Sequence, residues 1–123
     1  MKIHLAWLLA LLLLWGGEAA AQQDVGEAAK IRYLIESVET LQGVAFLRNG
    51  SEYDARQAAE HLRLKLRRAG SRVRTAEEFI RLCASRSSIS GEAYRLRFPD
   101  GRTIDAEQFF HERLKAFGPG TPR

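Results

Sequence analysis

Apolar residues recur every three or four positions in four stretches of this chain, a spacing that predicts four helices. We expect the first over residues 25–42, followed by Gly43 in the left-handed conformation that commonly ends a helix. The others are expected over residues 52–69, 76–84 and 106–117. The apolar face of the first helix consists of Ile31, Leu34, Ile35, Val38 and Leu41.

Polar residues with an N-capping pattern precede the last three of these helices. A Ser, Thr or Asp followed three residues later by an acidic or amide residue is typical of a capped helix start, since the side chains satisfy free backbone N–H groups. The expected pairs are Ser51 with Asp54, Thr75 with Glu78, and Asp105 with Gln108.

Strict alternation at Tyr94, Leu96 and Phe98 instead predicts a half-buried strand, with a turn over residues 99–101 and a short return strand over 102–104. A second short extended segment is expected over residues 44–47, closed by a tight turn at Asn49-Gly50. The fold class is therefore α+β and mostly helical: about four helices and one small β-hairpin in a single compact domain.

The first 21 residues have the pattern of a secretory signal peptide. A basic start at Lys2 precedes an apolar run from Leu5 to Trp15, too short to span a membrane, and small residues lead up to Ala21. We expect cleavage after Ala21, a periplasmic mature domain over residues 22–123 with an ordered core over about 25–117, and no transmembrane segment after cleavage. No nucleic acid is expected as a partner in that compartment.

Net charge and cysteine content limit the partners and the kinds of site that we expect. The net charge is +4 and stays +4 after cleavage, because Lys2 and Glu18 both leave. Anionic lipid, lipopolysaccharide or peptidoglycan groups are partners that this charge favours, although it also fits ordinary solubility. Cys83 is the single cysteine, which excludes an internal disulfide and a multi-cysteine metal site. We expect it to be a buried thiol, the alternative being a reactive one, and we expect no metal and no cofactor.

Four ordered motifs resemble the YfeK-like family, small exported proteins of Gram-negative bacteria with a domain of unknown function. The resemblance extends over about residues 31–117 and implies export and a shared fold, without an activity. The motifs are Phe46-x-Arg48-Asn49-Gly50, His61-Leu62-Arg63-Leu64-Lys65, Thr75-Ala76-Glu77-x-Phe79-Ile80 and Ala84-Ser85-x-Ser87-Ser88-x-Ser90-Gly91-x-x-Tyr94.

Asp54, His61 and Lys65 are spaced seven and four apart, which places them along one seam of the second expected helix. Together with a serine from residues 85–90, they allow a Ser/His-dependent hydrolase acting on an envelope substrate. Another alternative is inhibition of lysozyme, since Ser90-Gly91-x-x-Tyr94 resembles a short motif of periplasmic lysozyme inhibitors.

The leading hypothesis is a non-enzymatic domain that binds an envelope protein or an anionic envelope component. It predicts that the candidate polar residues gather at one exposed concavity, whereas a purely structural role predicts that they are spread apart or buried in mutual hydrogen bonds. The identity of the ligand and the oligomeric state stay open. The candidate binding residues are Arg48, Asn49, His61, Lys65, Ser90 and Tyr94.

Overall fold

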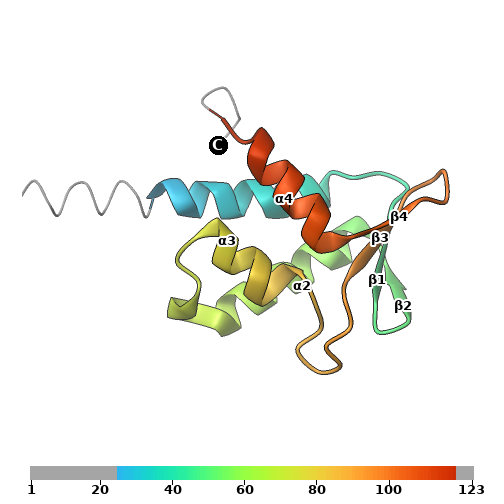
Figure 1. Cartoon of the computed structure of the whole chain (residues 1–123), viewed down its shortest axis with the longest axis horizontal. Coiled ribbons are helices and arrows are strands. Elements are labelled where there is room, and N and C mark those ends of the chain that lie inside the picture. The colour runs from blue at the N-terminus through green and yellow to red at the C-terminus, as the bar shows by residue number, and fades with distance from the viewer. Residues whose placement is uncertain (1–24, 119–123) are drawn as a thin grey trace, which may run out of the picture.

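A computed structural model describes residues 25–118, which form four helices and a four-stranded antiparallel sheet (Figure 1). The α+β class is confirmed for this single compact domain, although the sheet is larger than the one hairpin expected. The proposed signal peptide, its cleavage site and most of the C-terminal tail lie outside the described residues.

The N-terminal helix spans residues 25–39 and ends earlier than its apolar pattern predicts. Gly43 does have a positive φ of 69°, but it lies in the connection to the sheet and does not cap the helix. A Cβ at this position would approach Pro99 Cγ at 3.0 Å. Gly43 therefore allows the connection to pass close to the turn over residues 99–101, which lies at the same end of the sheet.

The second helix, α2 (Ala55–Ala69), begins later than predicted because residues 51–53 form strand β2 (Ser51–Tyr53). Ser51 is not its N-cap, so that expectation was wrong. Asp54 is the N-cap: its side chain accepts from the backbone N–H of Gln57 at 2.8 Å, and the Gln57 side chain bonds back to Asp54 N.

The capping box of Thr75 and Glu78 is confirmed at the start of α3 (Ala76–Phe79), which continues as a π-helical turn, η2 (Ile80–Ala84). A short 3-10 turn, η1 (Gly70–Arg72), connects α2 to this segment. The last helix, α4 (Ala106–Ala116), starts after Asp105 as expected, but the Asp105 side chain makes no capping bond. Its carboxylate lies 3.3 Å from Arg95 Nε across the sheet instead.

The sheet consists of two hairpins joined through their first strands, in the order β2-β1-β3-β4. Strand β1 (Ala45–Arg48) pairs with β2 on one side and with β3 (Arg95–Arg97) on the other, and β3 pairs with β4 (Thr103–Asp105). Asn49 and Gly50 both have positive φ, 50° and 79°, as a two-residue turn between twisted strands requires.

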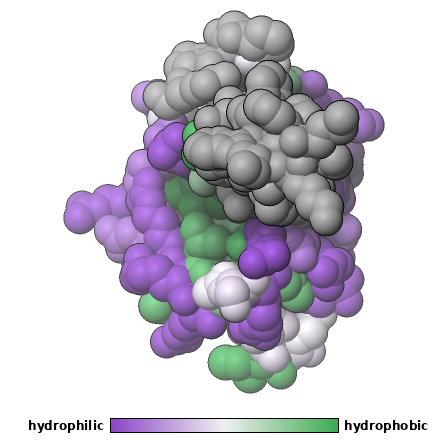
Figure 2. All heavy atoms as spheres, turned by 90° about the vertical axis from the view of Figure 1, so that its left-hand side faces the viewer, coloured by the Kyte–Doolittle hydropathy of each residue, from purple (hydrophilic) through white to green (hydrophobic). Residues whose placement is uncertain are grey.

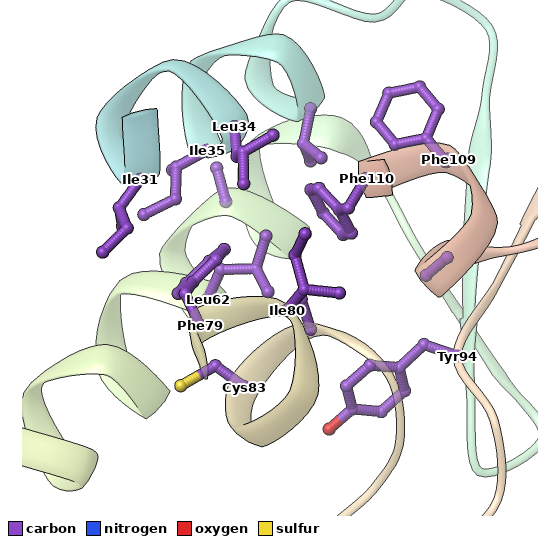
Figure 3. Packing of buried hydrophobic residues seen from close by; sticks show 14 of the residues in the cluster. Ile31, Leu34, Ile35, Leu62, Phe79, Ile80, Cys83, Tyr94, Phe109 and Phe110 are labelled. Atoms are coloured by element: carbon purple, nitrogen blue, oxygen red, sulfur yellow. The ribbon is translucent and has the colours of Figure 1, made fainter. Parts of the chain in front are cut away.

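The core lies between the helices and one face of the sheet, where Phe46 is aligned with Leu96 on β3 and with Tyr53 on β2. Phe110 of α4 makes edge-to-face contacts with Phe79 and Phe109. Figure 3 shows core side chains of the N-terminal helix, α2, the α3–η2 segment and α4 converging: Ile31, Leu34, Ile35, Leu62, Phe79, Ile80, Cys83 and Phe110. Cys83 is buried, and burial raises the pKa of its thiol.

A shallow groove between the N-terminal helix and α2 is lined by Ile31, Ile35, Leu66 and Val73, with Arg32 and Arg63 also in its wall. The end of the molecule seen in Figure 2 shows hydrophobic surface in a hollow flanked by hydrophilic side chains. None of the candidate site residues lies in this groove. Within residues 25–118, no helix is long and apolar enough to cross a membrane, and no cluster of three metal-ligating side chains is present.

Candidate functional site

A pocket of about 340 Å³ opens between the sheet and α2, with α4 at its inner end, and we refer to it as the α2 pocket. Apolar side chains form most of its wall, and the large core residues Phe46, Leu62 and Phe110 are among them. Its lining residues are Phe46, Leu47, Arg48, Tyr53, Gln57, Ala58, Glu60, His61, Leu62, Leu64, Ala84, Tyr94, Arg95, Ala106 and Phe110.

Ordinary strand and helix periodicity brings the polar side chains to one end of this pocket. Arg48 is two residues after Phe46 on β1, so both point to the same face of the sheet. Ala58, His61 and Lys65 lie at three- and four-residue spacing on α2 and therefore share the face that meets the sheet.

A continuous series of hydrogen bonds, the pocket network, links five side chains: Tyr53, Arg48, His61, Tyr94 and Lys65. Arg48 Nη2 donates to Tyr53 Oη at 3.0 Å, and Arg48 Nη1 lies 2.5 Å from His61 Nδ1. His61 Nε2 lies 3.2 Å from Tyr94 Oη, and Lys65 Nζ donates to the same oxygen at 3.0 Å.

Both ring nitrogens of His61 lie close to Arg48 Nη1, Nδ1 at 2.5 Å and Nε2 at 2.9 Å. A guanidinium only donates, so the neutral ring offers Arg48 one acceptor nitrogen and carries its proton on the other.

Burial, together with the nearby charges of Arg48 and Lys65, lowers the pKa of His61 to about 4. The ring is therefore neutral at neutral pH, and it supplies dipoles and no charge. The Arg48 guanidinium also lowers the pKa of Tyr53, chiefly through its hydrogen bond to the phenol.

Neither cation of this network has a carboxylate partner within residues 25–118. Arg48 is half-buried, and Lys65 is 9% exposed and bonded to the Arg86 carbonyl as well as to Tyr94. The other charged lining residues, Glu60 and Arg95, are paired elsewhere, with Arg56 and Asp105. The polar end of the pocket thus has an excess of positive charge.

Asn49 and Ser90 form a second, adjacent cluster, outside the pocket lining. Asn49 Nδ2 donates to Ser87 Oγ at 3.1 Å, and Ser90 Oγ donates to Asn49 Oδ1 at 2.5 Å. Ser87 is 5% exposed, and its hydroxyl also accepts from the backbone N–H groups of Ile89 and Ser90. These bonds hold the loop over residues 86–93, which protrudes beyond the helices and strands (Figure 1) and leaves Ile89 94% exposed at its tip.

The structure brings Arg48, His61, Lys65 and Tyr94 together, and three of them, Arg48, His61 and Tyr94, line the α2 pocket. Lys65 and Tyr94 are buried and the four bond to one another, as the structural alternative predicts. Sequence reasoning missed Tyr53 because the helix expected over residues 52–69 included it. The Asn49-Gly50 turn, which commonly joins two paired strands, was the signal for a strand here.

The arrangement expected for a Ser/His-dependent hydrolase is not found among residues 25–118. Asp54 caps α2, and no serine hydroxyl bonds to His61. Ser85 Oγ donates to the Ile80 carbonyl, while Ser87 and Ser90 bond to Asn49.

Fold and site together define a small α+β domain with an apolar pocket that ends in a half-buried cationic network. The chain belongs to a family of unknown function, DUF5329, whose family model matches residues 25–118. It is 37% identical over 94 residues to the uncharacterized protein YfeK of Salmonella typhimurium strain LT2, a match that covers 76% of this chain and 77% of that protein. The expected family is thereby confirmed. No solved structure matches the chain significantly.

Proposed function

We propose that this protein is a non-enzymatic binding domain of the periplasm whose α2 pocket takes a small molecule with an anionic group and an apolar body. The observation that carries the proposal is the guanidinium of Arg48, held at the end of an apolar pocket by two neutral partners, His61 and Tyr53. A ligand anion there replaces two neutral acceptors with a charged one, and a carboxylate can accept from both terminal nitrogens of the guanidinium at once.

The periplasmic part of the proposal is supported by the signal-peptide pattern of residues 1–21. In that compartment the pocket meets envelope components that combine acyl chains with anionic groups. Expression with a C-terminal tag, followed by osmotic-shock fractionation and intact-mass measurement, tests this part. We expect a soluble periplasmic chain that begins at Gln22; a chain that retains Met1 in the cytoplasm contradicts it.

A pair of fluorescent probes tests the binding function. Anilinonaphthalene sulfonate carries an anionic sulfonate on an aromatic body, and N-phenyl-1-naphthylamine lacks that group. We expect the sulfonate to bind the purified chain more tightly, and Arg48→Gln to remove that preference while binding of the neutral probe persists. Arg97→Gln is the matched control, since Arg97 pairs with Glu52 and does not line the pocket. Equal binding of both probes to the unmodified chain excludes the proposed anion site.

A second candidate function, docking of an envelope protein, is favoured by the loop over residues 86–93. Its hydrogen bonds to Asn49 pre-organise it, and an anchor side chain on a rigid loop binds with less loss of conformational entropy. Inhibition of lysozyme is the specific form suggested by Ser90-Gly91; both residues are exposed, but Tyr94 is buried in the pocket network. A lysozyme assay with the unmodified chain and Ile89→Ser tests it: inhibition must be present and must depend on Ile89.

A further inference from the structure

We infer that the ligand class of the α2 pocket is an aliphatic monocarboxylate of medium chain length, bound with its carboxylate on Arg48 and its chain between Phe46, Leu62 and Phe110. This inference rests on the proposed function and gives the ligand a chemical class. Four features of the pocket support it: the charge at its polar end, the geometry of its donors, the character of its wall, and its volume.

The polar end offers one positive charge to a ligand. Arg48 lines the pocket, whereas Lys65 lies behind Tyr94, outside the lining, with its ammonium bonded to Tyr94 Oη and the Arg86 carbonyl. His61 adds no charge in its neutral form. A singly charged anion is therefore balanced in the pocket, and a doubly charged phosphate monoester leaves one charge uncompensated at a half-buried site.

The donors match a planar group. The two terminal nitrogens of Arg48 are directed at His61 and Tyr53, and two parallel N–H bonds from such a fork fit the two oxygens of a carboxylate. Phosphate sites commonly use backbone N–H groups at a helix N-terminus. The cap of α2 at Asp54 and the first helical residues Ala55 and Arg56 are not among the residues that line this pocket.

The wall of the pocket favours a hydrocarbon over a peptide. Beyond Tyr94 and His61, the inner lining is made by Phe46, Leu62 and Phe110 with small residues between them, and it has no side-chain hydrogen-bonding group. A peptide placed there buries amide groups without partners, and each such group destabilises the complex. A polymethylene chain has no such cost.

The volume favours a small ligand. Small-molecule pockets commonly have volumes of about 300–1,000 Å³, and this one, at about 340 Å³, lies at the lower end of that range. Decanoate is therefore chosen as a chain of medium length. A much longer chain has to leave through the mouth of the pocket, where the exposed residues Gln57 and Glu60 lie.

Isothermal titration of the purified chain with decanoate, decyl phosphate and decanol at pH 7.5, below their micelle-forming concentrations, tests the assignment. We expect decanoate to bind at least tenfold more tightly than either of the others. Decyl phosphate binding as tightly as decanoate overturns the carboxylate assignment and leaves the anion-binding function standing. Decanol binding as tightly as decanoate contradicts both proposals. Failure of all three to bind overturns the inference, and the two fluorescent probes then decide the function separately.

Two further measurements test whether the planar fork of Arg48 is required and whether the ligand is aliphatic. Arg48→Lys keeps the charge but removes the planar fork, so we expect at least a fivefold loss of decanoate affinity at an unchanged melting temperature. Arg97→Lys is its control and is expected to bind as the unmodified chain does. A short apolar peptide with a free C-terminus that matches decanoate in affinity overturns the assignment to an aliphatic chain.

Discussion

Lys65 shows how a buried charge is accommodated without an opposite charge. Its ammonium is withdrawn from solvent, which is costly unless polar groups replace the water that it loses. The Arg86 carbonyl and Tyr94 Oη supply two hydrogen bonds, and the ammonium lies 4.9 Å from the centre of the Tyr94 ring. The Arg48 guanidinium makes the same kind of contact with Tyr53, whose ring centre lies 4.6 Å from Arg48 Cζ. Both cations are thus held by neutral groups, and Arg48, which lines the pocket, keeps its positive potential for a ligand.

His61 makes the stability of the ligand-free protein depend on pH. Its pKa in the folded state is about 4, below its ordinary value near 6.5, so between these values the unfolded chain binds more protons than the folded one. Stability is therefore expected to fall as pH decreases from 6.5 to 4. Because the side chain is partly exposed, we expect a loss of about 1–2 kcal/mol, measured by urea unfolding across this range.

His61→Gln is expected to remove that part of the pH dependence, since glutamine does not titrate. His111→Gln is the control, because His111 pairs with Glu77 on the surface and lies outside the pocket. A pH profile that is the same in His61→Gln and in the unmodified chain contradicts this account of His61.

At the scale of single residues, the sequence predicted which side chains belong to the site better than it predicted their hydrogen-bond partners. Helical spacing placed His61 and Lys65 on one face, and alternation placed Tyr94 on the inner face of a strand; these are three of the five network residues. The sequence favoured the Asp54 carboxylate as a partner of His61, and local patterns did not predict that the phenols of Tyr53 and Tyr94 take part instead. Asp54 is at the correct spacing, but its side chain is used by the end of the helix.

At the scale of elements, the largest difference from the sequence prediction is where α2 begins. Two polar residues three apart, Ser51 and Asp54, fit an N-cap pattern equally well at either position. The choice is made by pairing: Ser51 and Tyr53 are aligned with Arg48 and Phe46 on β1, so the chain stays extended until Asp54. A local pattern does not contain that information, because the partner strand decides it.

Two alanine substitutions distinguish the positions. Asp54→Ala removes a side-chain acceptor for the Gln57 N–H, and we expect it to lower the free energy of unfolding by about 1 kcal/mol. Ser51→Ala lies on an exposed edge strand and is expected to change it by less than about 0.5 kcal/mol. Urea unfolding of both variants measures the difference. A larger loss in Ser51→Ala than in Asp54→Ala contradicts the observed helix start.

The segment over residues 76–84 shows how a correct helical prediction can still miss the kind of helix. The buried positions Ala76, Phe79, Ile80 and Cys83 follow α-helical spacing, but the last five residues form a π-helical turn. The Ser85 hydroxyl donates to the Ile80 carbonyl at 2.6 Å, which satisfies the carbonyl of the first residue of that turn. Ala84 at the end of the turn is buried too and contributes to the pocket wall.

For the molecule as a whole, the decisive contact joins the two hairpins. The sequence predicted extended conformation over residues 44–47 and a hairpin at residues 94–104, and both are present. It did not predict that they pair, because each segment is short and local periodicity carries no information about a distant partner. The β1–β3 pairing turns two marginal hairpins into one sheet with an apolar face.

Hydrogen exchange tests that role of the central pair. We expect the slowest strand amides in β1 and β3, which have neighbours on both sides, and at least tenfold faster exchange in β2 and β4, which form the edges. Leu96→Ala, at a fully buried position of β3, is expected to destabilise by about 2–5 kcal/mol and to accelerate exchange in both hairpins. Acceleration confined to β3 and β4 shows that the hairpins are independent units.

The same pairing sets an order of events during synthesis of the chain. Phe46 pairs with Leu96, which is about fifty residues further along, so β1 has an unpaired edge while the residues of α2 and α3 are being made. An unpaired apolar strand edge can associate with other chains. The sheet cannot close before residues 95–97 are free, which makes completion of this domain a late event in synthesis. We therefore expect shortened chains that end before β3 to stay incompletely folded, and the main consequence to be faster degradation of the chain.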